Sequence, residues 1–168
     1  SFAVPRSKVR LVPGDIDDDG RDEVIVSNWD SYGPTDFGVR GSDGWLWKQN
    51  SNAPIHPVGA GRITSSQAEQ AVFKAKVNAT WVRPFDADGE YAWSNDVGDW
   101  VDEGCAFDID GDGREEVFAV SNNDGRLRVW DHEGTQLWSV TDRARVDGLL
   151  GAGDVHNTLE VVADGLQQ

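Results

Sequence analysis

The sequence predicts an all-β protein built from propeller-like blades, each made of four antiparallel strands. A nine-residue acidic pattern occurs twice, at 15–23 and 108–116, and each copy runs into β-branched or aromatic residues that are typical of strands. Trp47, Trp93 and Trp138 follow one another at intervals of 46 and 45 residues. This period is the length of one four-stranded blade, so it indicates a repeated unit rather than isolated strands.

The third repeat, at about 101–140, shows the plan of one blade in detail. Its four strands are expected at 103–107, 116–121, 126–130 and 135–140. Asn122-Asn123-Asp124-Gly125 is a strong hairpin signal between the second and third strands. Gly134 closes the next turn, where a positive φ favours glycine.

The first repeat, at about 9–50, follows the same plan. Its strands are expected near 9–12, 23–27, 37–40 and 45–48. Its middle connection, 28–36, is longer than the corresponding turn of the third repeat. We therefore expect the same blade with an enlarged connection.

The second repeat, at about 55–95, departs from the pattern. The segment 59–66 replaces the acidic loop, and 95–102 is interpreted as an insertion that carries Trp100. The segment 67–76 is ambiguous, because its alanines and Val72 would share one face of a helix. The repeat period instead predicts a strand near 72–77, and we adopt the strand.

A fourth repeat, at about 147–168, is partial, so a single domain over 1–168 is expected to hold about three and a half blades. Closed propellers usually have four to eight blades, and an isolated partial ring leaves strand edges unpaired. The chain is therefore expected to be part of a longer polypeptide or to form a homo-oligomer.

The two acidic segments predict cation-binding loops. Carboxylates stand at loop positions 1, 3, 5 and 9 around a glycine at position 6, a spacing that directs several hard oxygens to one point. An EF-hand is excluded, since position 12 is Val26 in one copy and Ala119 in the other where a bidentate Glu is needed. A solvated acidic turn without metal is the remaining alternative.

The charge composition limits the classes of binding partner that we expect. The chain has 15 basic and 30 acidic residues, a formal net charge of −15. Nucleic acid and anionic membrane both attract basic patches, so neither is expected as a partner. The sequence has no run of 18 apolar residues, and we expect no membrane insertion. Strong acidity fits cation binding and equally fits a high-salt habitat.

The acidic segments, with Gly14 before the first and Phe107 before the second, resemble the FG-GAP or VCBS repeats of integrin-α-like calcium-binding β-propellers. The resemblance implies about two Ca²⁺ ions, held by the acids at positions 1, 3, 5 and 9 and the carbonyl at position 7. The implied ligands are Asp15, Asp17, Asp19, the Arg21 carbonyl, Glu23, Asp108, Asp110, Asp112, the Arg114 carbonyl and Glu116. The fourth repeat keeps only Asp154 and Glu160 and is two residues shorter, so it is a weaker metal candidate.

The same resemblance implies an extracellular or cell-surface module that binds or adheres to a protein or glycan ligand. The sequon Asn78-Ala79-Thr80 adds slightly to that location. Trp29, Tyr32 and Trp100 lie in irregular connections, where binding residues concentrate, and are candidate ligand contacts. They could equally cover the enlarged connections.

Two other functions stay open. One is a fragment of a polysaccharide lyase, since some rhamnogalacturonan lyases resemble this repeat; the other is a structural subunit of a surface assembly. The sequence has no nucleophile motif, phosphate loop or zinc cluster, so a non-catalytic role is favoured over an enzyme.

Overall fold

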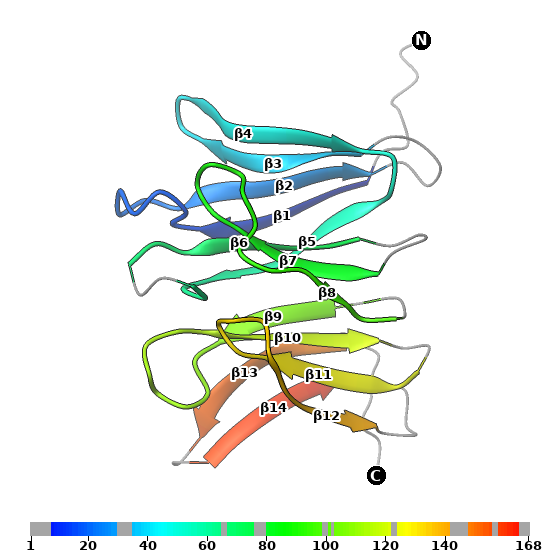
Figure 1. Ribbon diagram of the computed structural model, residues 1–168. Helices are drawn as coiled ribbons and strands as arrows, with labels where there is room; N and C mark the ends of the chain where they lie inside the picture. The colour runs from blue at the N-terminus through cyan, green and yellow to red at the C-terminus, as the bar shows by residue number, and fades with distance from the viewer. Residues whose placement is uncertain are drawn as a thin grey trace.

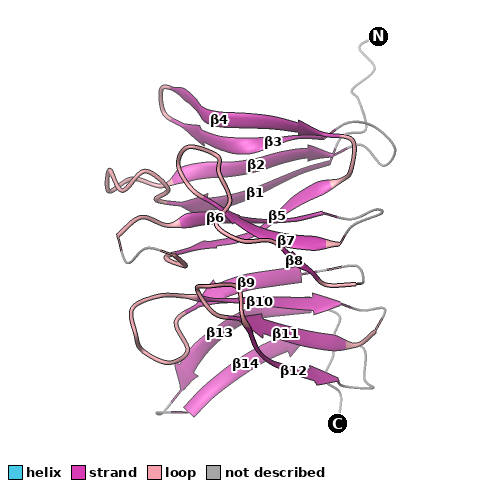
Figure 2. Cartoon of the chain, in the orientation of Figure 1, coloured by secondary structure: helices cyan, strands magenta, loops and turns pink. Residues whose placement is uncertain are grey.

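The computed structural model describes residues 8–29, 35–64, 67–75, 80–98, 101, 103–121, 124–141, 148–155 and 158–164. These residues form three four-stranded antiparallel sheets and one two-stranded sheet (Figures 1 and 2). No helix that could span a bilayer occurs in this part of the chain. The all-β, blade-like fold class is confirmed.

Strands pair in sequence order within every sheet. The first sheet consists of β1 (Lys8–Gly14), β2 (Glu23–Trp29), β3 (Thr35–Gly41) and β4 (Gly44–Ser51). The second consists of β5 (Ile55–Gly61), β6 (Gln70–Ala75), β7 (Trp81–Phe85) and β8 (Asn95–Asp96). The third consists of β9 (Glu103–Phe107), β10 (Glu116–Ser121), β11 (Arg126–Trp130) and β12 (Gln136–Thr141). The fourth contains β13 (Gly148–Val155) and β14 (Thr158–Asp164).

The ambiguous segment of the second repeat is a strand, as the repeat period predicted. All six residues of β6 are buried, so the strand is covered on both faces and shows no polar-apolar alternation. The interpretation of 95–102 as an insertion is wrong at its beginning. Asn95 pairs with Val82 and Asp96 with Trp81, so β8 is the short fourth strand of the second sheet.

The sheets stack face to face, with the first strand of each beside the first strand of the next (Figure 1). Side chains alternate across each strand, so one strand serves two interfaces. In β10, Val117 and Ala119 belong to the apolar cluster shared with the second sheet. Phe118 and Val120 belong to a separate cluster on the other face. The core is therefore a series of layers between neighbouring sheets.

Two of the periodic tryptophans, Trp47 and Trp93, join neighbouring sheets. The Trp47 ring stacks on Phe85 of the second sheet at 5.4 Å between ring centroids. Trp93 packs against the apolar cluster between the second and third sheets, which includes Trp130. Since each ring lies in the layer between two sheets, the 45-to-46-residue spacing follows from one such contact per blade.

The connections separate into two ends of the stack (Figure 1). The acidic loops, which join β1 to β2 and β9 to β10, lie at the same end as the turns that join β3 to β4 and β11 to β12. Chain direction places the last residue of β2 and the first residue of β3 at the opposite end. Tyr32, Trp100 and the sequon residue Asn78 lie outside the described residues, as does the side chain of Trp29.

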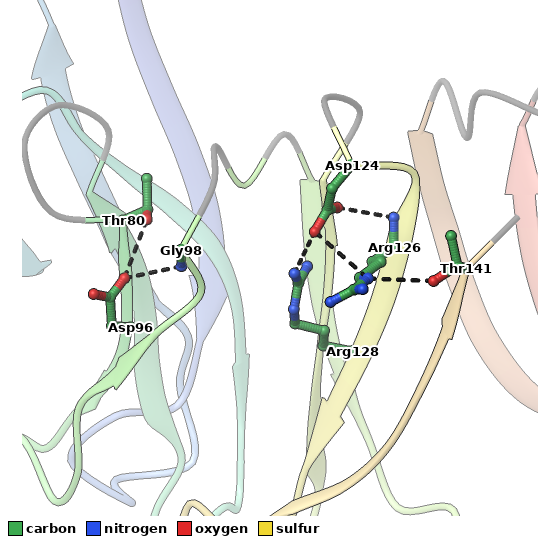
Figure 3. Close-up of polar contacts among 7 residues, drawn as sticks. All are labelled: Thr80, Asp96, Gly98, Asp124, Arg126, Arg128 and Thr141. Atoms are coloured by element: carbon green, nitrogen blue, oxygen red, sulfur yellow. Dashed lines mark hydrogen bonds and ion pairs between the residues drawn. The ribbon is translucent and has the colours of Figure 1, made fainter. Parts of the chain in front are cut away.

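Figure 3 shows two polar networks, one around Asp96 and one around Asp124. Asp96 Oδ1 accepts hydrogen bonds from Thr80 Oγ1 at 3.2 Å and from the Gly98 N–H at 2.9 Å. Asp124 accepts from the Arg126 N–H at 3.0 Å and forms an ion pair with Arg128. These carboxylates fix the course of two connections through short-range hydrogen bonds.

Candidate metal-binding loops

The first acidic loop gathers its carboxylates around its own backbone. Oxygen atoms of Asp15, Asp17 and Asp19 lie within 4.8 Å of one another. Asp15 accepts the N–H groups of Asp19 and Gly20, each at 3.1 Å, through its two oxygens. These bonds curl the loop back on its first residue, so the acids at positions 1, 3 and 5 face a common point.

The second acidic loop repeats this arrangement. Oxygen atoms of Asp108, Asp110 and Glu116 lie within 4.8 Å of one another. The two oxygens of Asp108 accept the N–H groups of Gly111 at 2.7 Å and Gly113 at 2.9 Å. In both loops, which are 93 residues apart in sequence, the first Asp accepts the N–H of the glycine at position 6.

The backbone conformation of the two acidic loops explains why glycine occurs at certain loop positions. Position 6 has a positive φ in both loops, 83° at Gly20 and 87° at Gly113. Position 4 also has a positive φ, 78° at Gly111 but 59° at Asp18, which is a non-glycine residue in the left-handed region. Asp tolerates this region better than most residues, so the first loop keeps the shape at some conformational cost.

The acid at position 9 closes each loop from the strand side. Glu23 Oε2 accepts the Ile16 N–H at 3.0 Å, and Glu116 Oε2 accepts the Ile109 N–H at 2.9 Å. Both glutamates begin a strand and are almost fully buried, with exposed fractions of 5% and 2%. The backbone N–H that follows the first acid thus gains an acceptor in each loop.

These buried glutamates carry an electrostatic penalty. Desolvation, followed by the negative charges of Asp110, Asp108 and Asp112, raises the pKa of Glu116 above its usual value. Desolvation and the charges of Asp17 and Asp19 likewise raise the pKa of Glu23. In both loops the buried glutamate therefore interacts with neighbouring Asp charges, and a cation among them would offset both the desolvation and the repulsion.

An open hollow beside the first loop has room for water or a further ligand oxygen. It has a volume of about 310 Å³ and is lined by Asp17, Asp19 and Glu23 on one side. Residues 41–46 of the β3–β4 turn line the other side. Since Ca²⁺ commonly completes its shell with water, this opening fits such an ion.

The loop of the second sheet keeps the closing hydrogen bonds but lacks the carboxylates at positions 1, 3, 5 and 9. Gln70, 47 residues after Glu23 and 46 before Glu116, begins β6 at the equivalent place. Its Oε1 accepts the N–H groups of Ile63 and Thr64, each at 2.9 Å. Arg62 stands where the acidic loops have their first Asp. The sequence analysis missed Gln70, although its spacing marks it.

Consecutive loops are also hydrogen-bonded to one another. The Glu69 N–H donates to the Asp15 carbonyl at 3.2 Å, and Glu69 Oε2 accepts the Asp15 N–H at 3.1 Å. One sheet further, the Glu115 N–H donates to the Arg62 carbonyl at 2.8 Å. The loop of the second sheet, through Arg62 and Glu69, thus bonds to both acidic loops, and sequence reasoning did not identify these contacts.

The remaining predicted metal ligands are the carbonyls of Arg21 and Arg114 and the side chains of Asp154 and Glu160. The N–H groups of Arg21 and Arg114 donate to Asp19 at 2.9 Å and Asp112 at 2.8 Å. Ligation by their carbonyl oxygens stays a prediction. Asp154 pairs with Leu159 and Gly153 with Glu160 in the β13–β14 ladder. The side chains of Asp154 and Glu160 lie outside the described part of the structure.

The chemistry of the loops fits a hard divalent cation. Each offers four carboxylates and carbonyl oxygens, and neither contains the nitrogen or sulfur ligands that favour zinc. A flexible, partly open oxygen shell suits Ca²⁺ better than Mg²⁺, which needs stricter octahedral geometry. The donor set is therefore compatible with one Ca²⁺ ion in each loop.

Comparison with known proteins supports the fold alone. No protein-family model and no curated protein sequence matches the chain. Among solved structures, BBS1N in complex with ARL6DN is similar with a TM-score of 0.57 and 15% identity, over 95% of this chain and 47% of that chain. BamB from Moraxella catarrhalis is similar with a TM-score of 0.54 and 14% identity, over 91% and 42% of the respective chains.

A protein of unknown function from Bacteroides caccae is similar with a TM-score of 0.53 and 12% identity, over 90% of this chain and 51% of that chain. BamB and BBS1N are β-propeller-like, as this chain is. The chain spans about half, or less, of the length of these three solved chains.

Proposed function

We propose that this chain belongs to a calcium-binding β-propeller that acts outside the cell as a non-catalytic module for a protein or glycan ligand. The observation that carries the metal assignment is Glu116. It is 2% exposed, and one of its oxygens is held by the Ile109 N–H. Asp108 and Asp110 lie within 4.8 Å of it. Because burial and two neighbouring carboxylates both destabilise the charged form of Glu116, a bound cation would stabilise it.

The second sheet supports this assignment by contrast. There the corresponding side chain is Gln70, which accepts the same kind of backbone hydrogen bond without a charge. Loop closure therefore needs an acceptor oxygen but no carboxylate. The negative charges of Glu23 and Glu116 are then in excess of what loop closure needs, and cation binding accounts for them.

Calorimetric titration with CaCl₂ tests the metal sites directly. The wild-type chain, stripped with EDTA, is expected to bind two Ca²⁺ ions. Each of Asp17→Asn and Glu116→Gln is expected to bind one, and the double variant none. Glu116→Gln is the sharper variant, because glutamine preserves the acceptor for Ile109, as in the second sheet. Glu90→Gln, in an exposed turn outside both loops, is the control and is expected to bind two ions.

Stability provides a second readout of the same proposal. Metal that binds only the folded chain stabilises it by about 2.7 kcal/mol at a free concentration one hundred times Kd. Thermal unfolding is therefore expected at a higher temperature in CaCl₂ than in EDTA. If the two curves coincide and calorimetry detects no binding, the loops are acidic turns and the metal assignment is wrong.

The ligand-binding part of the proposal has separate support. BBS1N, which has the same fold, was solved in complex with a protein, ARL6DN. A propeller of this kind therefore accommodates a protein ligand. Trp29, Tyr32 and Trp100 remain the candidate contacts, and alanine variants of each would be compared with wild type on glycan arrays and against candidate proteins. Loss of binding with an unchanged Ca²⁺ stoichiometry would assign these residues to the ligand.

Two alternatives have their own readouts. A structural subunit would show polymerisation that depends on protein concentration. A lyase fragment would release unsaturated products from acidic polysaccharide. Either result would replace the non-catalytic binding function without affecting the metal assignment.

A further inference from the structure

Arg83 lies in the middle of β7 and contacts two aromatic rings. Its guanidinium carbon is 4.0 Å from the centre of the Trp81 ring and 4.3 Å from the centre of the Tyr91 ring. Trp81 precedes Arg83 by two residues on the same face of the strand, whereas Tyr91 forms a bridge with Phe85, two residues after Arg83. The two rings therefore approach the guanidinium from opposite directions along the strand.

Further contacts fix these three side chains, Trp81, Arg83 and Tyr91, which we call the Arg83 cluster. Phe85 contacts the Trp81 ring at 6.4 Å and the Tyr91 ring at 5.7 Å between ring centroids. Phe85 is 2% exposed and belongs to the apolar layer between the first and second sheets. Arg83 Nε donates a hydrogen bond to Ser94 Oγ at 2.9 Å. Because the guanidinium is oriented before any ligand arrives, less side-chain freedom is lost on binding.

The terminal nitrogens of Arg83 have no partner within the described part of the chain. Ser94 is the one hydrogen-bond acceptor that this part offers to Arg83, and none of its carboxylates forms an ion pair with Arg83. Acids are nevertheless plentiful, with 30 acidic and 15 basic residues in the chain. Asp86 and Asp96, on either side in sequence, accept backbone N–H groups of their own connections instead. The remaining N–H groups of the guanidinium are therefore available to a ligand.

The geometry of Arg83 selects a carboxylate. A guanidinium binds a carboxylate through two parallel hydrogen bonds in its own plane. Since Nε is occupied by Ser94, these two bonds come from the terminal nitrogens. The aromatic contacts hold the guanidinium without neutralising its charge, so an anionic group is attracted to this edge.

The size of the Arg83 cluster favours a sugar over a protein as the carrier of this carboxylate. A protein interface buries about 800 Å² on each partner and has an apolar centre. Among the described residues of the second sheet and its connections, Tyr91 is the only large hydrophobic residue that is exposed, at 46%. One open aromatic ring beside one guanidinium matches a single sugar ring, whose C–H groups pack on the electron-rich aromatic face.

The net charge of the chain limits the ligand further. A formal charge of −15 repels a densely charged polyanion at long range. One oriented guanidinium without a neighbouring cation among the described contacts of the cluster suits an isolated carboxylate. A glycan in which single acidic sugars stand among neutral ones meets both conditions.

We propose that the Arg83 cluster binds a uronic acid residue of a glycan. The sugar carboxylate accepts hydrogen bonds from both terminal nitrogens of Arg83, and the sugar ring lies against the exposed Tyr91 ring. This site rests on the proposed glycan-binding function and supplies its ligand class. It is separate from Trp29, Tyr32 and Trp100, the candidate contacts taken from the sequence.

A matched pair of sugars tests the carboxylate. Methyl β-D-glucuronide carries a carboxylate where methyl β-D-glucoside carries a hydroxymethyl group. Ligand-observed NMR titration of the whole chain is expected to show saturable binding of the glucuronide and about tenfold weaker binding of the glucoside. Arg83→Gln is expected to raise the Kd of the glucuronide about tenfold. Arg83→Lys is expected to raise it less, because an ammonium keeps the charge without the planar fork.

The aromatic part of the site has its own variants. Tyr91→Ala is expected to weaken both sugars, whereas Tyr91→Phe, which keeps the ring, is expected to leave both Kd values unchanged. Arg10→Gln is the matched charge control, because Arg10 is an exposed arginine of the first sheet that is paired with Glu103. This control is expected to bind the glucuronide as wild type does.

Three results would overturn the proposal. One is an equal Kd of the glucuronide for wild type and Arg83→Gln, or no binding to wild type. Another is equal affinity for acetate and the glucuronide, which would leave an anion site without a sugar subsite. The third is Arg83-dependent binding of an acidic peptide more tightly than of the glucuronide, which would make the partner a protein.

Glycan arrays distinguish failure of this site from failure of the proposed function. Array binding that is the same for wild type and Arg83→Gln would overturn this site and leave the proposed function in place. Wild type that binds neither glycans nor proteins would overturn both. The Ca²⁺ stoichiometry from calorimetry is independent of either result.

Discussion

The indole nitrogen of Trp47 donates a 2.9 Å hydrogen bond to the backbone carbonyl of Asp86, across the interface between the first and second sheets. The ring is 7% exposed and contacts Phe37, Phe73 and Phe85. One side chain therefore provides both apolar burial and a polar connection between blades. This combination makes the tryptophan sensitive to substitution in two separable ways.

Replacing Trp47 should separate these contributions. Trp47→Ala is expected to lower the free energy of unfolding by about 3–5 kcal/mol, since it leaves a cavity in the interface. Trp47→Phe keeps a ring but leaves the Asp86 carbonyl without its donor, and about 1–2 kcal/mol should be lost. Urea denaturation followed by far-UV circular dichroism measures both. Trp45→Ala, at a 42% exposed position, should cost less than about 1 kcal/mol.

The turn glycines offer a matched pair of substitutions. Gly89 and Gly98 both have a positive φ, 80° and 71°, but only Gly89 lies beneath a tryptophan. Gly98→Ala should cost about 1 kcal/mol from backbone strain alone. Gly89→Ala should cost about 1–2 kcal/mol more, because its Cβ would meet the Trp47 ring. Equal losses in urea denaturation would show that the ring contact does not constrain this turn.

The ion pair between Asp124 and Arg128 is expected to make the free energy of unfolding depend on pH (Figure 3). Burial alone raises the pKa of Asp124, but the hydrogen bond and charge of Arg128, with the Arg126 N–H, outweigh it and hold this pKa below the usual 3.8. A lowered folded-state pKa stabilises the fold above the unfolded value. That stability is lost as the pH falls through the folded-state pKa.

Asp124→Asn should therefore destabilise the chain by about 2 kcal/mol at pH 7, leaving the Arg128 guanidinium without its counter-charge. The side chain of Arg128 is only 9% exposed, which makes this loss larger than for a surface pair. The difference from wild type should shrink below about pH 3.8. Chemical denaturation at several pH values measures it. Asp43→Asn, in an exposed turn, should show no comparable difference.

The single cysteine should be unreactive in the folded chain. Burial, and to a lesser extent the charge of Glu115, raises the pKa of Cys105 to about 12. Only the thiolate attacks disulfide reagents, so labelling at pH 8 should be on the order of 100-fold slower than in the urea-unfolded chain. Glu115→Gln should change this rate only slightly, because burial is the larger cause. Similar labelling rates in the folded and unfolded chains would contradict this assignment.

Local sequence patterns predicted most strands and both acidic loops. The strands of the third repeat were expected at 103–107, 116–121 and 126–130, and the structure has the same bounds. These limits depend on turn residues and on β-branched or aromatic runs, which act over a few neighbouring residues. The short strand β8 was missed, since two residues form too brief a pattern to recognise.

The amino-acid sequence by itself determined the repeat period, the all-β class and the grouping of acids in two loops, because turn preferences and side-chain alternation are properties of adjacent residues. Only the tertiary structure decided that Trp47 contacts Gly89 and that Glu69 bonds to Asp15. Such contacts join separate sheets over about 40 to 54 residues. Their formation depends on how closely the sheets stack and in which register, and no local preference of the chain specifies either.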